Sequence, residues 1–207
     1  MIAIVDYGCG NLFSLQRSFE YIGVPTVVTG DERELERADK LVLPGVGAFG
    51  DAAKKLRDTG LGAAVKRQAE AGKDLLGICL GMQLLFEKSY EYGEHEGLGL
   101  IPGEVRPIEI PAELQPEEQP YKVPQMGWNS LHLVREHPLF AHTREGEFVY
   151  FVHSYHGCGC EDALIAQTEY GIPITAAVAR GHVCGTQFHP EKSGPAGLAI
   201  LRAFSEL

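Results

Sequence analysis

The first half of the chain alternates short apolar runs with amphipathic stretches. Residues 1–6 predict a buried strand, and the stretch capped by Asn11 carries large apolar residues three and four apart, as on one helical face. Residues 25–28 predict the next strand, a short charged helix follows from Asp31, and residues 40–43 predict a third strand. Because helices that alternate with strands serve as crossovers, this half predicts parallel strands covered by helices.

The same alternation continues up to a cysteine at a strand end. Helical patterns over residues 52–56 and 63–70 precede an apolar strand at 74–78, which runs directly into Cys79. The apolar spacing after this cysteine predicts a helix that extends through Phe86. We therefore expect a helix to begin immediately after Cys79.

The second half of the chain has a different pattern. From about Gly97 on, short β-prone runs follow one another without long helices, which predicts a sheet-rich and partly antiparallel region. Residues 111–124 are rich in Pro, Glu and Gln and predict a surface loop or hairpin insertion, and residues 197–207 predict a terminal helix. The β-prone runs are residues 105–110, 130–134, 147–154, 164–169, 174–179 and 183–188.

These patterns together predict an α/β fold. It has an open, mostly parallel central sheet flanked by helices, with a more antiparallel second half. No Ser/Gly-rich or charged linker divides the chain, so we expect one domain over residues 1–207.

Composition and charge exclude several classes of protein. Hydrophobic residues make up 44% and charged residues 22%, which argues against a disordered or fibrous chain. The formal net charge is −10 and the basic residues are scattered, so we expect no nucleic-acid partner. The first apolar run is short and lacks a basic flank, so we expect no signal peptide, no membrane span and a cytoplasmic protein. Five cysteines in such a chain argue against a disulfide framework.

Cys79 lies in a segment with the layout of a nucleophile elbow. Residues 77–81, Gly-Ile-Cys-Leu-Gly, join the predicted strand to the predicted helix, as in Gly-x-Ser-x-Gly with sulfur in place of oxygen. The glycines remove side chains where strand and helix crowd each other, and a helix N-terminus favours the Cys79 thiolate. The N–H of Leu80 is then placed for an oxyanion, and the Pro-Gly-Val-Gly loop is the candidate for a second donor, from Val46 or Gly47. An inert buried thiol is the commoner fate of a cysteine, so this motif alone leaves both interpretations open.

A candidate base follows the last predicted strand. His189-Pro190-Glu191 comes directly after residues 183–188, and in an extended chain residues two apart point the same way. Glu191 would then orient the imidazole of His189. An oriented His189 would hold Cys79 as a thiolate and later protonate a departing amine, which suits amide cleavage.

Three ordered motifs now carry a resemblance to a known family. Pro44 to Gly47, Gly77 to Gln83 and Gln187 to Glu191 resemble the signatures of class I glutamine amidotransferases. The resemblance implies a flavodoxin-like fold and a triad of cysteine, histidine and glutamate. It also implies attack on the side-chain amide of glutamine, release of ammonia, hydrolysis of a γ-glutamyl thioester by water, and no cofactor.

Three further segments, residues 6–11, 124–129 and 151–155, resemble one branch of that family, the glutaminase subunits of imidazole glycerol phosphate synthases. By that resemblance, the partner is a (β/α)₈-barrel cyclase subunit, which forms a heterodimer with the glutaminase and uses its ammonia in histidine biosynthesis. The resemblance also implies substrate-binding roles for Gln83, Glu91, Ser154 and Tyr155, and cyclase-facing roles for Asn11, Arg17, Trp128, Asn129, Tyr150 and Lys192.

Other interpretations remain open at this point. A stand-alone cysteine hydrolase would need no partner, another synthase would use the same glutaminase chemistry, and a non-catalytic regulatory module would keep only the fold. Two of these residues have a second interpretation. Trp128 could be a buried packing residue, and Gln83 could be a solvated residue on the surface of a helix. Residues 153–160 contain two histidines and two cysteines, but Cys-x-Cys lacks the usual zinc spacing, so we expect no metal site. Residues 111–120 depart from the short family pattern.

Overall fold

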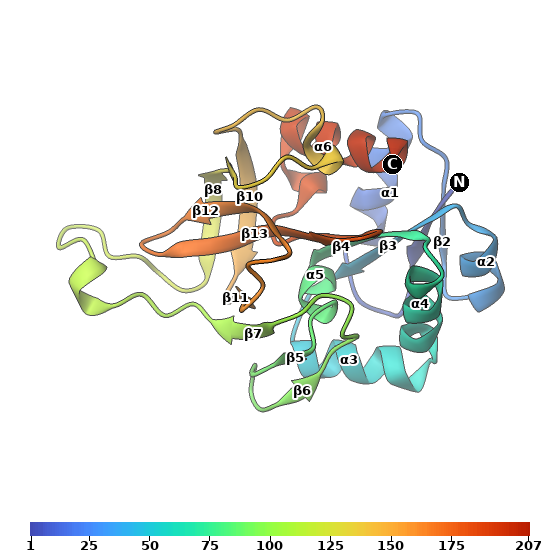
Figure 1. Ribbon diagram of the computed structural model, residues 1–207, viewed down its shortest axis with the longest axis horizontal. Helices are drawn as coiled ribbons and strands as arrows, with labels where there is room; N and C mark the ends of the chain where they lie inside the picture. The colour runs from blue at the N-terminus through green and yellow to red at the C-terminus, as the bar shows by residue number, and fades with distance from the viewer.

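An eight-stranded sheet forms the middle of the protein, and helices cover both of its faces (Figure 1). The structure is a computed structural model that describes residues 1–207. In spatial order the strands are β2 (Thr26–Thr29), β1 (Ile2–Val5), β3 (Lys40–Gly45), β4 (Asp74–Cys79), β14 (Val183–Thr186), β13 (Pro173–Arg180), β12 (Leu164–Glu169) and β9 (His132–Leu133). Neighbours from β2 to β14 are parallel, and β13, β12 and β9 continue the sheet antiparallel. The predicted fold class is therefore confirmed.

The helices divide into two groups, one on each face of the sheet (Figure 1). Helices α1 (Leu12–Tyr21) and α6 (Gly194–Glu206) lie on one face; α2 (Glu32–Arg37), α3 (Phe49–Asp58), α4 (Leu61–Glu70) and α5 (Leu80–Leu84) lie on the other. The side chain of Asn11 caps α1 as predicted, by accepting the N–H of Ser14, and Asp31 caps α2 in the same way. Gly23, with a φ of 78°, lets the chain turn after α1 toward β2.

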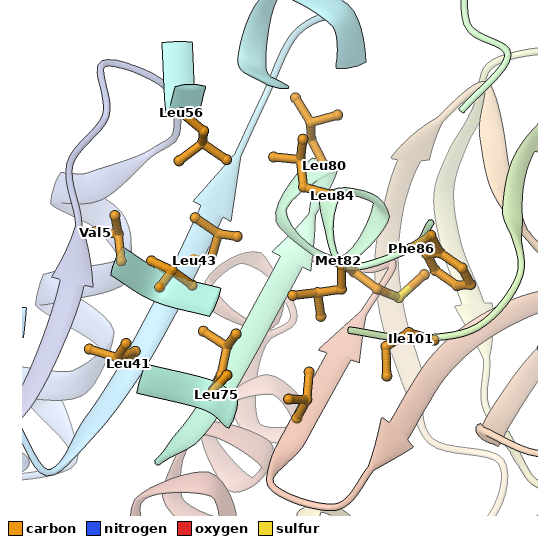
Figure 2. Close-up of a cluster of buried hydrophobic side chains, with 14 of the residues drawn as sticks. Val5, Leu41, Leu43, Leu56, Leu75, Leu80, Met82, Leu84, Phe86 and Ile101 are labelled. Atoms are coloured by element: carbon orange, nitrogen blue, oxygen red, sulfur yellow. The ribbon is translucent and has the colours of Figure 1, made fainter. Parts of the chain in front are cut away.

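Each face of the sheet has its own hydrophobic core. In β1, Ala3 and Val5 point to the side of α2 to α5, whereas Ile2 and Ile4 point to α1 and α6. Figure 2 shows the first core, where side chains of β1, β3 and β4 pack against those of α3 and α5. Because the central strands are buried on both faces, their sequences are continuous apolar runs.

Two smaller sheets flank the antiparallel end of the main sheet. One pairs β8 (Gln125–Ser130) with β10 (Phe148–His153), and the other has the order β11 (Tyr155–Cys158), β7 (Glu104–Pro107), β5 (Lys88–Ser89) and β6 (His95–Glu96). The sequence did not predict β8 or β11, and it predicted β7 to extend to residue 110. The strand ends at Pro107, although the next N–H, that of Ile108, still donates to the carbonyl of Ser154 at 2.9 Å. The strand predicted to end at residue 188 ends at Thr186.

Residues 111–124 form the predicted surface loop (Figure 1). The loop contains one short 3₁₀ turn, η1 (Ala112–Leu114), and its residues are exposed or half-buried. A second 3₁₀ turn, η2 (Pro138–Phe140), lies between β9 and β10 and contacts α6. None of the strands of the eight-stranded sheet lies within residues 111–124, so this surface loop does not interrupt the central sheet.

The helix predicted to extend through Phe86 is shorter, because α5 ends at Leu84. Residues 98–101 return alongside it, and their N–H groups donate to the carbonyls of residues 84–86 at 2.8 to 3.0 Å. A longer helix would have paired those carbonyls internally. Such long-range pairing leaves no periodic signal in the sequence, so the apolar spacing overestimated this helix.

Candidate active site

Cys79 lies at the junction of β4 and α5, at the C-terminal end of the parallel strands. Its φ of 54° and ψ of −112° are unusual for a non-glycine residue and cost on the order of 1–3 kcal/mol. A Cβ on Gly81 would lie 1.8 Å from the carbonyl oxygen of Leu43, and a Cβ on Gly77 would lie 2.7 Å from that of Gly81. The predicted crowding between strand and helix is confirmed, and only glycines fit on both sides of the cysteine.

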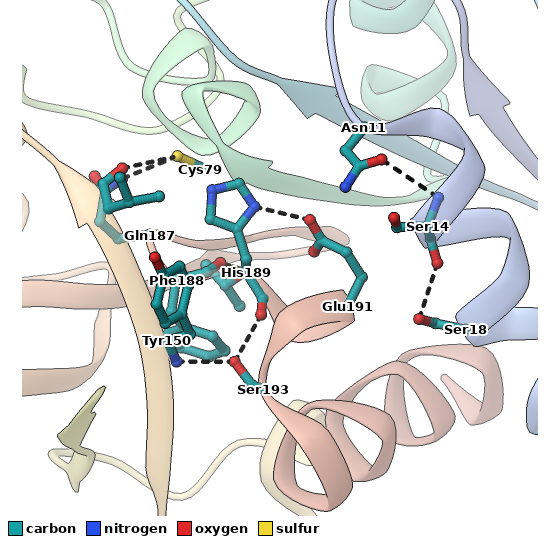
Figure 3. Close-up of polar contacts among 12 residues, drawn as sticks. Asn11, Ser14, Ser18, Cys79, Tyr150, Gln187, Phe188, His189, Glu191 and Ser193 are labelled. Atoms are coloured by element: carbon teal, nitrogen blue, oxygen red, sulfur yellow. Dashed lines mark hydrogen bonds and ion pairs between the residues drawn. The ribbon is translucent and has the colours of Figure 1, made fainter. Parts of the chain in front are cut away.

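His189 and Glu191 form a buried pair close to Cys79 (Figure 3). The ring Nδ1 lies 2.8 Å from Oε1 of Glu191, and 3% of each side chain is exposed. The sequence argument assumed an extended segment here, and that was wrong. Residues Pro190–Lys192 form a 3₁₀ turn, η3, because proline has its φ already set for a first turn position. The tight turn, not an extended chain, brings the carboxylate back to the ring.

Hydrogen bonds fix the backbone that carries His189 (Figure 3). Its N–H donates to the carbonyl of Tyr150 at 3.0 Å, and the hydroxyl of Ser193 donates to its carbonyl at 2.6 Å. The same hydroxyl accepts the N–H of Tyr150 at 3.0 Å. Strand β10 therefore holds the turn on which the candidate base sits.

The surroundings of His189 favour its charged form. Burial alone would lower the pKa of the ring, but hydrogen bonds to Cys79 and Glu191 outweigh burial and raise the pKa to about 9. Because Nδ1 faces Glu191, Nε2 is the ring nitrogen left to face Cys79. This geometry provides an imidazolium beside the sulfur, which favours the thiolate needed for nucleophilic attack.

A cavity of about 340 Å³ opens beside Cys79, within the usual size range for a small-molecule site. Most of the residues proposed for the site from the sequence line this one cavity. They are Val46, Gly47, Cys79, Leu80, Gln83, Glu91, Ser154, Tyr155 and His189, together with Lys192 from the cyclase-facing set. Glu191 stands behind His189, where it contacts the ring.

The loop of residues 44–47 is held at both ends by groups that the sequence argument missed or assigned otherwise. The hydroxyl of Tyr7 is buried and donates to the carbonyl of Pro44 at 2.8 Å. Burial raises the pKa of Tyr7 far above its usual range, so the phenol remains a donor. Oε2 of Glu91 accepts the N–H of Phe49 at 2.5 Å, just beyond the loop. The loop that carries the candidate oxyanion donors is therefore fixed from outside.

Gln83 is buried, with 5% of its surface exposed, so the solvated interpretation of this residue was wrong. Its Nε2 donates to the carbonyl of Tyr155 at 2.9 Å and to Oε1 of Gln187 at 3.0 Å. Gln187 belongs to the motif of residues 187–191, but the sequence pattern assigns it no role. The signal in the sequence is a long polar side chain directly before Phe188-His189, at the end of a run predicted to be buried.

Three of the cyclase-facing candidates, Trp128 of β8, Tyr150 of β10 and Lys192 of η3, lie close together. Trp128 of β8 is 53% exposed, so the interpretation as a buried packing residue was wrong. Its ring meets the ring of Tyr150 edge-on at 5.9 Å, and the ammonium of Lys192 lies 5.9 Å from the centre of the Tyr150 ring. Met126 and Phe148 are also exposed on the same two-stranded sheet. These side chains form an exposed aromatic patch near the cavity.

The remaining cyclase-facing candidates have contacts within the chain. Asn11 caps α1, and Arg17 of the same helix pairs with Glu20 on the surface. Asn129 accepts a hydrogen bond from the amide of Gln125 at 3.0 Å. Asn11 also turns its amide toward the carboxylate of Glu191 in Figure 3, so α1 begins next to the candidate triad.

The segment with two histidines and two cysteines begins at the cavity, which His153 lines, whereas His156 and Cys158 are not among the residues that line it. Nε2 of His156 lies 3.5 Å from the sulfur of Cys158. Burial lowers the pKa of His156 to about 4 and raises the pKa of Cys158 to about 11, so this pair is neutral at pH 7.

No helix of the chain has the length and apolar character needed to cross a membrane.

An open α/β fold with a cysteine on a strand-to-helix elbow, facing a buried histidine–glutamate pair, is the arrangement of enzymes that use a cysteine nucleophile. Comparison with known families gives the finer assignment. The chain belongs to the glutamine amidotransferase class-I family, which it matches over residues 3–206.

Curated relatives match the chain over almost its whole length. It is 52% identical over 207 residues to the imidazole glycerol phosphate synthase subunit HisH of Sulfurimonas denitrificans, covering 100% of this chain and 98% of the relative. It is 51% identical over 205 residues to the subunit of the same name from Geobacillus kaustophilus, covering 99% and 95%. Among solved structures, PurLQS from Thermotoga maritima superposes with a TM-score of 0.75 at 19% identity, covering 99% of this chain and 97% of that one. The last similarity concerns the fold alone.

Proposed function

We propose that this chain is the glutaminase subunit of imidazole glycerol phosphate synthase. It hydrolyses glutamine to glutamate and ammonia and supplies the ammonia to a cyclase subunit in histidine biosynthesis. The observation that carries the proposal is the full-length similarity to relatives with that name, in a chain whose Cys79 and His189 line one cavity while Glu191 is paired with His189. One glutaminase domain over residues 1–207 contains all of these groups.

In this proposal Cys79 is the nucleophile. Its thiolate attacks the side-chain amide carbon of glutamine, and the proton on Nε2 of His189 passes to the departing ammonia. The γ-glutamyl thioester then reacts with water, which gives a proton to His189 as the thiolate leaves. Glu191, 2.8 Å from the ring, keeps the imidazole oriented and stabilises its charge.

Two oxyanions form in this sequence, one for each step, and the same donors serve both. The N–H of Leu80 follows the nucleophile at the start of α5 and is the first donor. Val46 and Gly47 line the cavity from the loop fixed by Tyr7, and their N–H groups are the candidates for the second. Gln83, Glu91 and the backbone at Ser154 and Tyr155 enclose the rest of the glutamine.

The cyclase docks, in this proposal, over the aromatic patch of Trp128, Tyr150 and Lys192 and over the start of α1 with Asn11 and Arg17. Support comes from the exposure of Trp128 and from the position of Lys192, which lines the cavity and contacts Tyr150. A partner seated there would adjoin the site that releases ammonia. We place the heterodimer in the cytoplasm, where the five free cysteines of this chain would stay reduced.

The decisive experiment measures glutamate release by the purified chain alone, with the cyclase, and with the cyclase and its nucleotide ligand. We expect low turnover by the isolated chain and a rise on assembly, since ammonia released without an acceptor wastes glutamine. Full activity of the chain alone would contradict partner gating. The variant Cys79→Ala should release no glutamate while still binding the cyclase, and undiminished turnover in that variant would defeat the mechanism.

A further inference from the structure

Gln187 is a fully buried amide beside the candidate nucleophile that the mechanism above does not use. It follows β14, and its Nε2 lies 3.8 Å from the sulfur of Cys79 (Figure 3). Its Oε1 accepts a hydrogen bond from Gln83 at 3.0 Å. Both polar ends of this side chain therefore have partners, and one partner is the reacting atom.

The direction of the hydrogen bonds is fixed by a backbone carbonyl. The oxygen of Tyr155 can only accept, so the amide group that faces it at 2.9 Å must be the Nε2 of Gln83. The same nitrogen faces Gln187 at 3.0 Å, so Gln187 must present its oxygen to Gln83. The remaining end of Gln187, which faces Cys79, is then its N–H donor. Two amides in series thus aim a donor at the sulfur.

We propose that Gln187 is a further catalytic residue, whose side-chain N–H stabilises the negative charge on the Cys79 sulfur. The inference rests on the proposed function of Cys79 as the nucleophile. As a thiol, the sulfur has the carbonyl of Val152 at 4.0 Å as its acceptor; as a thiolate, it needs donors. His189 gives up its proton during the cycle, whereas the amide of Gln187 donates in every protonation state. The donor therefore helps both when the thiolate attacks and when it leaves the thioester.

Several ionisable groups surround the sulfur and are left in place by changes at Gln187. They are Tyr7 after β1, Glu91, His153 of β10, and His189, Glu191 and Lys192 at and within η3. These groups are the same in the wild-type chain and in a Gln187 variant. A difference between the two chains in how the alkylation of Cys79 depends on pH therefore reports on the Gln187 amide.

The test measures the rate at which iodoacetamide alkylates Cys79 as a function of pH, with the Cys79 peptide quantified by mass spectrometry. Gln187→Met removes the donor and keeps a side chain of similar length, and Gln187→Glu keeps the acceptor for Gln83 but places a carboxylate at the sulfur. Gln119→Met, in the exposed insertion, makes the same chemical change far from the site and serves as the matched control.

We expect the midpoint of the alkylation profile to rise by about one pH unit in Gln187→Met, because a hydrogen bond to a charged group is of that order. Below the midpoint, alkylation should slow about tenfold. Gln187→Glu should raise the midpoint further, and Gln119→Met should leave it unchanged. Thermal unfolding checks that each variant is folded, and if the methionine variant is not, the isosteric glutamate variant decides.

A midpoint that stays at the wild-type value in a folded Gln187→Met or Gln187→Glu chain would overturn the inference. The readout does not depend on turnover, so its failure can be told apart from failure of the proposed function. A chain that released no ammonia but showed the shifted midpoint would contradict only the function, and an active glutaminase with an unshifted midpoint would contradict only the role of Gln187.

Discussion

Replacing Glu191 with glutamine should weaken the pH dependence of stability that the buried His189 pair creates. Glu191→Gln keeps the shape of the side chain, which is 3% exposed, and removes its charge. In the wild-type chain the pKa of His189 rises from 6.5 to about 9, owing to hydrogen bonds to Cys79 and Glu191 that overcome burial. A group whose folded pKa lies above its unfolded value stabilises the fold fully below the unfolded pKa, and this stabilisation is lost as pH rises through the folded pKa.

The size of the effect follows from the two pKa values. One pKa unit corresponds to about 1.4 kcal/mol, so a rise of roughly 2.5 units corresponds to about 3 kcal/mol of unfolding free energy. Two hydrogen bonds share this contribution, and losing the carboxylate should remove about 1–2 kcal/mol of it. The loss concerns the window between the ordinary pKa of 6.5 and about 9, because outside it the charge on the ring does not differ between folded and unfolded chains.

Urea denaturation at about pH 6 and about pH 9.5 measures this contribution. The fall in unfolding free energy between the two pH values should be smaller in Glu191→Gln than in the wild-type chain. The comparison between the two chains cancels titrations that they share. Glu206→Gln breaks a histidine–glutamate contact of 2.6 Å between side chains that are 43% and 52% exposed, and this control should change little. An equal fall in the wild-type and Glu191→Gln chains would refute the reasoning.

Two further substitutions test the loop and the docking surface. Gly45→Ala would place a Cβ 2.8 Å from both the N–H of Gly81 and the hydroxyl of Tyr7, so we expect a loss of about 1–3 kcal/mol in urea denaturation and slower glutamate release. Wild-type stability and turnover in that variant would show that the loop is not tightly held. Trp128→Ala should weaken cyclase binding by about 2 kcal/mol, or roughly 30-fold in Kd by calorimetry, without lowering the Tm of the chain, because Trp128 is 53% exposed. An unchanged Kd would remove this side chain from the proposed interface.

The parts of the fold that sequence patterns could predict are those whose signal is local. The strands β1, β3 and β4 are buried on both faces and therefore appear as uninterrupted apolar runs. Strand β8 alternates buried or half-buried positions with exposed ones that include Met126, and it contains a glycine, so neither alternation nor propensity identified it. Its pairing partner β10 supplies the hydrogen bonds that make it a strand.

The candidate site divides in the same way. Cys79 and its flanking glycines could be interpreted from a short segment, because the elbow is a local backbone requirement. The partnership of Gln83 with Gln187 joins residues 104 positions apart, and no spacing in the sequence encodes it. The hydrogen bond from Tyr7 to the loop at Pro44 depends equally on two strands lying side by side. Contacts of this kind follow from tertiary packing alone.

The positive φ of Cys79 means that folding and chemistry favour different residues at one position. Glycine would adopt the backbone of this turn without strain, whereas cysteine holds it at some cost in stability. A Cys79→Gly substitution would therefore relieve backbone strain, and it would also remove the sulfur that the proposed reaction needs. If Cys79 is the nucleophile that we propose, cysteine persists at position 79 only under selection for the reaction, and a copy of this gene freed from that selection should lose this cysteine early.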